Sequence, residues 1–286
     1  RETLRYAVRM KDDSGFIFMT NFQDHDTMRV DQEDLQFKLK LKNENLIIPA
    51  KRTLTLKKDA SVVLPFNLHM KDAVLKYATA QLLTKIEDRG KEHYFFFSPE
   101  GIMPEYNFDK NTLKSTRTFY TPVPGTGSTF SVMTKGGEEL LITTLTREQA
   151  LNTTKVNNHI LITSATVLPE KEQCTLLSLG KNQIDYILYP SNVGWKQQSS
   201  EVEAVSATVD WKKIGARRIT VHIDQPSLPQ VNEYFLRIHY VGDVAMAFIN
   251  DMMVLDHFYY GAPWTIGMRR FQNELKENIS CLSHDL

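Results

Sequence analysis

Short alternating segments separated by turn-forming residues constrain the fold of this 286-residue chain more than any single motif. In residues 35–41, apolar and polar side chains alternate with a period of two, which is typical of a half-buried β-strand. Similar segments cover residues 4–10, 16–21, 53–56 and 61–66, with turn-type residues between them. Short strands with such regular interruptions predict an antiparallel sandwich.

Helical signals are sparse. The segment from Thr146 to Gln149 fits a capping box and predicts a short helix. A second short helix is allowed by the helical spacing of Met268, Phe271, Leu275 and Ile279. Nowhere do strands alternate with long helices, so the sequence does not encode a parallel α/β barrel.

We therefore predict an all-β protein made of two antiparallel β-sandwich units with few short helices. The first unit spans residues 1–155 and is an immunoglobulin-like or similar sandwich. The second spans residues 156–286 and is a jelly roll of the galactose-binding-like type. The boundary is placed near residues 152–158, just after the expected helix.

A hairpin with an aromatic loop is expected near the C-terminus. Two apolar runs, residues 244–249 and 252–255, are separated by Asn250 and Asp251, which tolerate the positive φ of a two-residue turn. An aromatic cluster interrupted by Gly261 and Pro263 follows: Phe258, Tyr259, Tyr260 and Trp264. Such rings are common where sugars or other domains dock.

Composition excludes some classes of partner and cofactor. The chain has 34 basic and 34 acidic side chains, so it has no overall field to attract nucleic acid, and we predict no nucleic-acid partner. No apolar run is long enough to cross a bilayer, which predicts no membrane partner. The two cysteines have no metal-binding spacing, and we predict no metal and no cofactor.

Several stretches, spread through the chain in one order, resemble the region after the catalytic barrel in bacterial glycoside hydrolase family 35 β-galactosidases. They are residues 6–9, 14–23, 64–67, 75–81, 98–102 and 242–264. This resemblance implies a non-catalytic accessory region that docks on the barrel domain of the same polypeptide and contacts a galactoside-containing glycan. It also favours an extracytoplasmic or periplasmic location. A start at Arg1 agrees with a piece of a longer polypeptide.

One departure from the family concerns the C-terminus. After residue 271 the resemblance predicts another apolar strand, but residues 276–286 are mostly polar. We therefore expect the jelly roll to lack a closing strand and to have an exposed edge.

The carboxylates that glycoside hydrolysis requires cannot be assigned. The reaction needs two carboxylates on either side of the scissile bond, and in the family resembled here both lie on barrel strands, one of them after an asparagine. Three glutamates follow an asparagine in this chain: Glu44, Glu233 and Glu274. Without a barrel to orient them we assign no catalytic residue, and we predict that the chain alone is inactive as a hydrolase.

Contact with carbohydrate is the most plausible direct activity. Aromatic rings stack on sugar C–H faces, and Tyr259, Tyr260 and Trp264 are the leading candidates, with Trp195 behind them and Asp256, beside His257, to bind hydroxyls. Alternatively, these rings pack between sheets or against the barrel.

Trp211 lies in an alternating run and is predicted to belong to the core. An alternative to the accessory role is a free-standing carbohydrate-binding or surface-adhesion β-sandwich protein.

Overall fold

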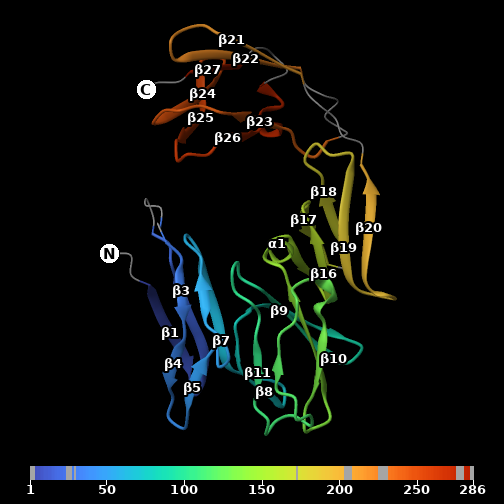
Figure 1. The fold of residues 1–286 in the computed structure, drawn as a ribbon. Coiled ribbons are helices and arrows are strands. Elements are labelled where there is room, and N and C mark those ends of the chain that lie inside the picture. The colour runs from blue at the N-terminus through green and yellow to red at the C-terminus, as the bar shows by residue number, and fades with distance from the viewer. Residues whose placement is uncertain are drawn as a thin grey trace. The chain divides into compact units, whose positions relative to one another are not determined.

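A computed structural model of the chain describes residues 4–23, 28, 30–171, 173–202, 208–224, 231–274 and 280–283. Strands make up nearly all of the regular structure, and most strand pairs are antiparallel, as Figure 1 shows. One pair, β10 with β14, is parallel. The predicted fold class, all-β with antiparallel sandwiches and few short helices, is confirmed.

The chain divides into two compact units. Unit 1 comprises Arg1–Ser178 and Gln183–Glu201, and unit 2 comprises Leu179–Asn182 and Val202–Leu286. The predicted boundary at residues 155 and 156 lies instead inside unit 1, within β15 (Thr153–Val156). The reason is an apolar cluster shared by segments on both sides of that position: Ile86, Phe95, Leu145, Ile160, Ile162 and Tyr189.

Unit 1 begins with a six-stranded sheet in the order β1-β2-β7-β8-β11-β12. Its strands are β1 (Arg5–Lys11), β2 (Ser14–Thr20), β7 (Ser61–Met70), β8 (Ala73–Ala78), β11 (Tyr106–Phe108) and β12 (Phe119–Tyr120). Two ribbons pack on β2 and β7 through a shared apolar cluster. They pair β3 (Gln32–Leu35) with β6 (Leu54–Leu56), and β4 (Phe37–Lys40) with β5 (Asn45–Ile48). The single strand predicted for residues 35–41 is thus divided between two ribbons.

Two further sheets and a ribbon complete unit 1. The second sheet has the order β13-β14-β10-β9, and the third has the order β15-β16-β19-β20. Their strands are β9 (Gln81–Asp88), β10 (Lys91–Phe97), β13 (Phe130–Met133), β14 (Glu139–Leu145), β16 (His159–Thr163), β19 (Gln183–Ser191) and β20 (Gly194–Glu201), together with β15. The ribbon pairs β17 (Thr166–Pro169) with β18 (Cys174–Leu177), and a 3-10 turn, η1, covers Thr126–Ser128.

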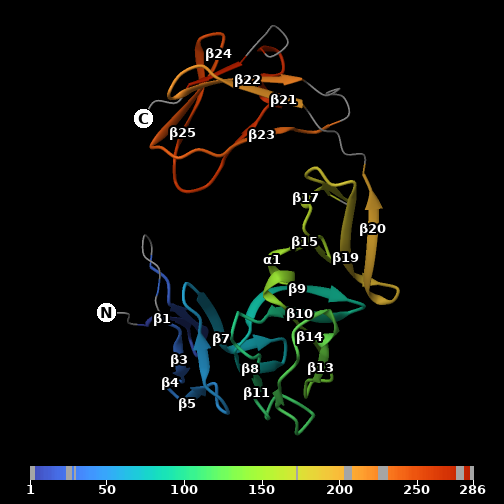
Figure 2. The same cartoon turned by 45° about the horizontal axis from the view of Figure 1, so that its top comes forward.

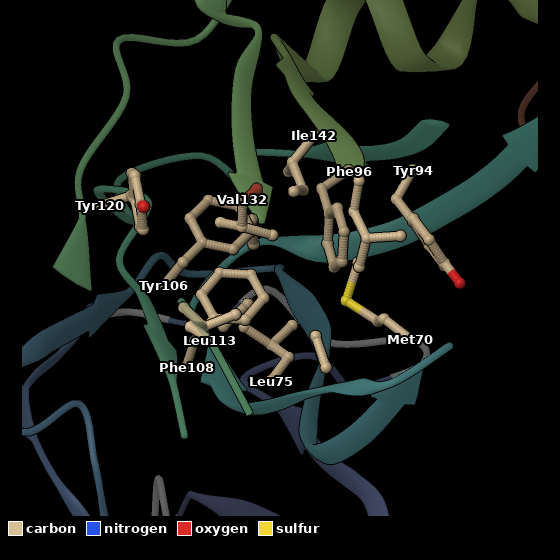
Figure 3. Packing of buried hydrophobic residues seen from close by; sticks show 14 residues of the cluster. Met70, Leu75, Tyr94, Phe96, Tyr106, Phe108, Leu113, Tyr120, Val132 and Ile142 are labelled. Atoms are coloured by element: carbon tan, nitrogen blue, oxygen red, sulfur yellow. The ribbon is translucent and has the colours of Figure 1, made fainter. Parts of the chain in front are cut away.

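The largest core of unit 1 lies between its first and second sheets. Figure 3 shows the rings of Phe96 and Tyr106 and the sulfur of Met70 gathered there. The ring centroids of Phe96 and Tyr106 are 5.3 Å apart in an edge-to-face pair. Tyr94 lies at the margin, and its hydroxyl points away from the other labelled residues in the same figure. The first two sheets are therefore the two layers of a sandwich.

Unit 2 is a smaller sandwich with layers of unequal width. One layer is a five-stranded sheet in the order β21-β22-β27-β24-β25, and the other is the ribbon β23–β26 (Figures 1 and 2). The strands are β21 (Thr208–Lys213), β22 (Arg218–Asp224), β23 (Phe235–Ile238), β24 (Val244–Ile249), β25 (Met252–Phe258), β26 (Trp264–Gly267) and β27 (Ser280–Ser283). The chain passes from one layer to the other and back, as in Greek-key sandwiches.

The C-terminal segment corrects one expectation. A closing strand was expected to be missing, but β27 pairs with both β22 and β24 and occupies the centre of the five-stranded sheet. Backbone pairing on both sides makes a strand there despite the polar sequence.

Local signals in the sequence are largely confirmed. The helix α1 (Arg147–Leu151) begins at Thr146 with the predicted capping box. Asn250 and Asp251 have φ angles of 49° and 58°, as a type I′ hairpin turn requires. The second expected helix is present only as a 3-10 turn, η3, at Arg269–Phe271, and residues 275–279 lie outside the described part of the chain.

Candidate functional site

A groove on the inner face of β21 lies in unit 2. The register pairs Trp211 with Val221, which is 3% exposed in the core, so Trp211 faces inward from the sheet. The two-stranded ribbon β23–β26 is narrower than the five-stranded sheet on which it packs, and all six residues of β21 remain exposed. The uncovered space has a volume of ≈ 560 Å³ and is bordered by β21, β22 and β23.

The prediction that Trp211 belongs to the core is wrong, because 69% of this residue is exposed. Alternation correctly indicates the inward face of the strand, but the second layer does not extend over β21. An inward-facing ring without a covering layer presents its surface to the groove. Sequence periodicity reports the face of a strand and carries no information about the width of the opposite layer.

An aromatic cluster centred on His257 adjoins the groove. The His257 ring is stacked on Trp264, with centroids 5.4 Å apart and planes 11° apart, and its other ring neighbours are Tyr240 and Tyr260. Tyr240 and Trp264 both line the groove. The cluster therefore supports one wall of the groove from within the sandwich.

Hydrogen bonds fix the orientation of Tyr240 and His257. The Tyr240 hydroxyl donates to the His257 carbonyl at 3.0 Å, and its oxygen lies 2.6 Å from Nδ1 of the same residue. Burial raises the pKa of Tyr240, with a smaller contribution from Tyr259, so its hydroxyl keeps its proton. These bonds hold the Tyr240 ring in one orientation at the wall of the groove, and a flat ring is suited to a ligand with an apolar face.

The predicted site residues of unit 2 have different environments. Trp264 lines the groove but is only 6% exposed, since it also packs in the core. Tyr259 is half-buried 5.3 Å from the Tyr240 ring, while Tyr260 is 75% exposed. Asp256 is exposed and lies on the face of β25 opposite to His257, because adjacent strand residues alternate.

Trp195 belongs to unit 1 and is not part of this groove. Its ring contacts Tyr189 and Phe95, with centroid distances of 4.9 Å and 5.9 Å, and packs against the apolar cluster that joins the second and third sheets. This environment corresponds to the packing alternative considered for the aromatic residues.

Sequence reasoning missed the basic side of the groove. Arg217 and Arg218 alone form too short a run to predict a basic patch, yet Lys213 and Arg237 line the same groove. Arg237 comes from the ribbon layer, so no spacing in the sequence could have joined it to the others. Proximity of a Trp and four basic residues within positions 211–218 was the only local signal, and three of the four line the groove.

The three glutamates that follow asparagines have structural partners. Burial tends to raise the pKa of Glu44, but hydrogen bonds from Lys76 and Asn67 outweigh it, and the pKa is lowered. Glu233 accepts hydrogen bonds from the backbone N–H groups of Tyr234 and Arg269 at 3.0 Å and 2.8 Å. Glu274 is exposed, and none of these three glutamates lines the groove.

Among the described residues, no group of three or more His, Cys, Asp and Glu side chains is placed to hold a metal ion. In the same part of the chain, no helix has the length and apolar character to span a membrane. In comparisons with known proteins, neither a family model nor a curated protein sequence matches this chain.

Proposed function

We propose that this chain is a non-catalytic accessory region of a β-galactosidase-like glycoside hydrolase and that unit 2 contacts carbohydrate through the groove on β21. The observation that carries the proposal is the exposed Trp211 ring in a groove that Tyr240 and basic side chains also line. An accessible indole stacks on the apolar face of a pyranose, and neighbouring donors bind its hydroxyls. Trp211 replaces Trp264 as the leading stacking residue, because Trp264 is buried.

A second surface supports the docking role of unit 1. In β1, Tyr6, Val8 and Met10 face the same side as the buried Ile17 and Met19 of β2, yet they are 66%, 38% and 48% exposed. This apolar row extends the core, and the ribbons cover it only in part: Tyr6 contacts the Phe37 ring of β4 with centroids 6.0 Å apart. Burying such a row against a barrel domain of the same polypeptide would remove apolar area from water.

The carbohydrate proposal is tested by calorimetric titration with galactose-containing oligosaccharides. Trp211→Ala is expected to weaken binding on the order of tenfold or more, because the stacking surface is lost. Phe235→Ala is the matched control: Phe235 is an exposed ring of unit 2, 49% accessible, that does not line the groove. Absence of binding to every galactoside and acidic saccharide tested, or equal losses in the two variants, would contradict the proposal.

The accessory role has its own test. A barrel-coding stretch upstream in the same reading frame would support it, whereas an unrelated upstream sequence would favour the free-standing alternative. Turnover of a nitrophenyl galactoside by the purified chain, abolished by substituting one glutamate, would overturn the non-catalytic assignment.

A further inference from the structure

The groove concentrates positive charge in a chain whose total charge is zero. Its lining includes four basic side chains, Lys213, Arg217, Arg218 and Arg237, and no Asp or Glu among the described residues. A concave surface lined by one sign of charge raises the local concentration of ligands of the opposite sign. The balance of charges over the whole sequence conceals this local excess.

The cations border the groove from both layers of the sandwich. Lys213 lies two residues after Trp211 on the same face of β21, next to Ile219 of β22, whereas Arg237 comes from β23 in the opposite layer. Within the described ranges, no ion pair engages Lys213, Arg218 or Arg237. These charges are therefore available to a ligand that enters the groove beside the indole.

From this arrangement we infer that the groove binds an acidic saccharide, with Trp211 stacked on a pyranose face and the carboxylate of a uronic acid held by the basic side chains. The inference deepens the proposed carbohydrate-binding function and rests on it. An arginine guanidinium matches a carboxylate with two parallel hydrogen bonds, which gives geometric selectivity as well as charge attraction. A neutral sugar can stack on the indole and accept hydrogen bonds from the basic side chains, but it lacks the charge-assisted bonds that a carboxylate makes.

The test compares two ligands in which a carboxylate is replaced by its uncharged methyl ester. Calorimetric titration with an oligogalacturonate and with its fully methyl-esterified form uses the same sugar ring and linkage. We expect the acid to bind on the order of tenfold more tightly at low ionic strength. This difference should shrink as salt is added, because exposed charges are screened. A sulfated galacto-oligosaccharide separates a preference for carboxylate from a preference for any anion.

Substitutions of groove residues test which side chains bind the acid. Arg237→Gln and Lys213→Gln should each weaken binding of the acid roughly three- to tenfold and have a smaller effect on the ester. Lys212→Gln is the matched control, because Lys212 is the same residue type on the same strand, faces the other side of the sheet and does not line the groove. Trp211→Ala should weaken binding of both ligands.

The outcomes separate this inference from the function on which it rests. Equal affinity for acid and ester, with loss in Trp211→Ala, would overturn the acidic preference and leave carbohydrate binding intact. Stronger binding of the sulfated sugar than of the uronate would overturn the carboxylate assignment. Binding of a polyglutamate peptide that is as tight and does not depend on Trp211 would overturn the saccharide in favour of an acidic protein partner.

Discussion

The edge strands β1 and β21 are alike in geometry and different in chemistry. Each begins the strand order of the main sheet of its unit, each has only exposed residues, and each has an inward row that the opposite layer leaves largely exposed. The row on β1 is apolar, with Tyr6, Val8 and Met10, whereas the row on β21 includes Trp211 and Lys213 and has arginines beside it.

This difference shows that the function of an exposed edge strand depends on the chemistry of its side chains. An apolar row is suited to a protein surface, which buries area without supplying charges. A ring among cations is suited to a ligand that has an apolar face and a negative group. The two edges are therefore suited to the two proposed roles, docking for unit 1 and ligand contact for unit 2.

The largest expected effect tests which strands of the first sheet of unit 1 are buried by the opposite layer. Ile17 is 0% exposed and pairs with Val8, which faces the same side one strand further out. Ile17→Ala should lower the free energy of unfolding by about 2–5 kcal/mol, because it leaves a cavity in the core. Val8→Ala should cost under about 1 kcal/mol. Denaturant titration measures both, and equal losses would mean that β1 is covered in solution.

The two units also differ in the burial of a histidine: His93 of unit 1 is fully buried, whereas His257 of unit 2 is half-buried. His93 is 0% exposed and lies 3.0 Å from the Tyr189 hydroxyl through Nδ1 and 2.7 Å from the Thr143 hydroxyl through Nε2. Tyr189 donates to Asp88 at 2.7 Å, so its oxygen accepts from Nδ1–H and Nε2 accepts from Thr143. The ring is bonded as the neutral form.

Burial lowers the pKa of His93 from 6.5 to about 4, although Asp88 partly opposes this shift. As the pH falls, the histidine of the unfolded chain takes up its proton near pH 6.5, before the buried histidine of the folded chain does. The free energy of unfolding is therefore highest above pH 6.5 and decreases as the pH falls towards 4, by about 3 kcal/mol in total. Denaturant titrations across this range measure the loss, and His93→Gln should remove this part of the pH dependence. An unchanged pH dependence in the variant would show that His93 is not its source.

A smaller effect tests the corresponding position in unit 2. Val221 of β22 is 3% exposed and pairs with the exposed Trp211 of β21, so the buried part of the inner face ends between these two strands. Val221→Ala should cost about 2 kcal/mol of unfolding free energy, whereas Trp211→Ala should change it by less than about 0.5 kcal/mol. A cost above 2 kcal/mol for Trp211→Ala would show that the ring is buried and would remove the groove from consideration.

The smallest expected effect concerns the opposite edge of the same sheet. The turn at Asn250 and Asp251 sets the pairing of β24 with β25, which places His257 on the inward face opposite Ala245. Asp251→Gly should stabilise unit 2 by about 0.5 kcal/mol, because glycine adopts positive φ without strain. Asp251→Val should destabilise it by about 1 kcal/mol. Thermal unfolding measures both, and the same sign for both would argue against the turn geometry.

Local sequence patterns predicted the elements that depend on neighbouring residues. The capping box at Thr146 and the turn at Asn250 and Asp251 are examples, because their hydrogen bonds and φ angles involve residues a few positions apart. The split of residues 35–41 between two ribbons was not predictable, because it depends on partners in β5 and β6.

The candidate site was predictable only in part. The aromatic residues after β25 were found, and the structure joins Tyr259, Tyr260 and Trp264 to Tyr240 and His257. Trp211 and Arg237 were missed, since they are brought together by strands from two layers.

The sequence by itself determined the all-β class, the faces of many strands and the turns, because these follow from alternation and from backbone preferences of single residues. Only the tertiary structure decided which inward faces are covered. Whether an inward face is buried depends on how many strands each layer contains and on where the chain crosses between layers. For this reason Trp195 packs against a core while Trp211 remains exposed in a groove.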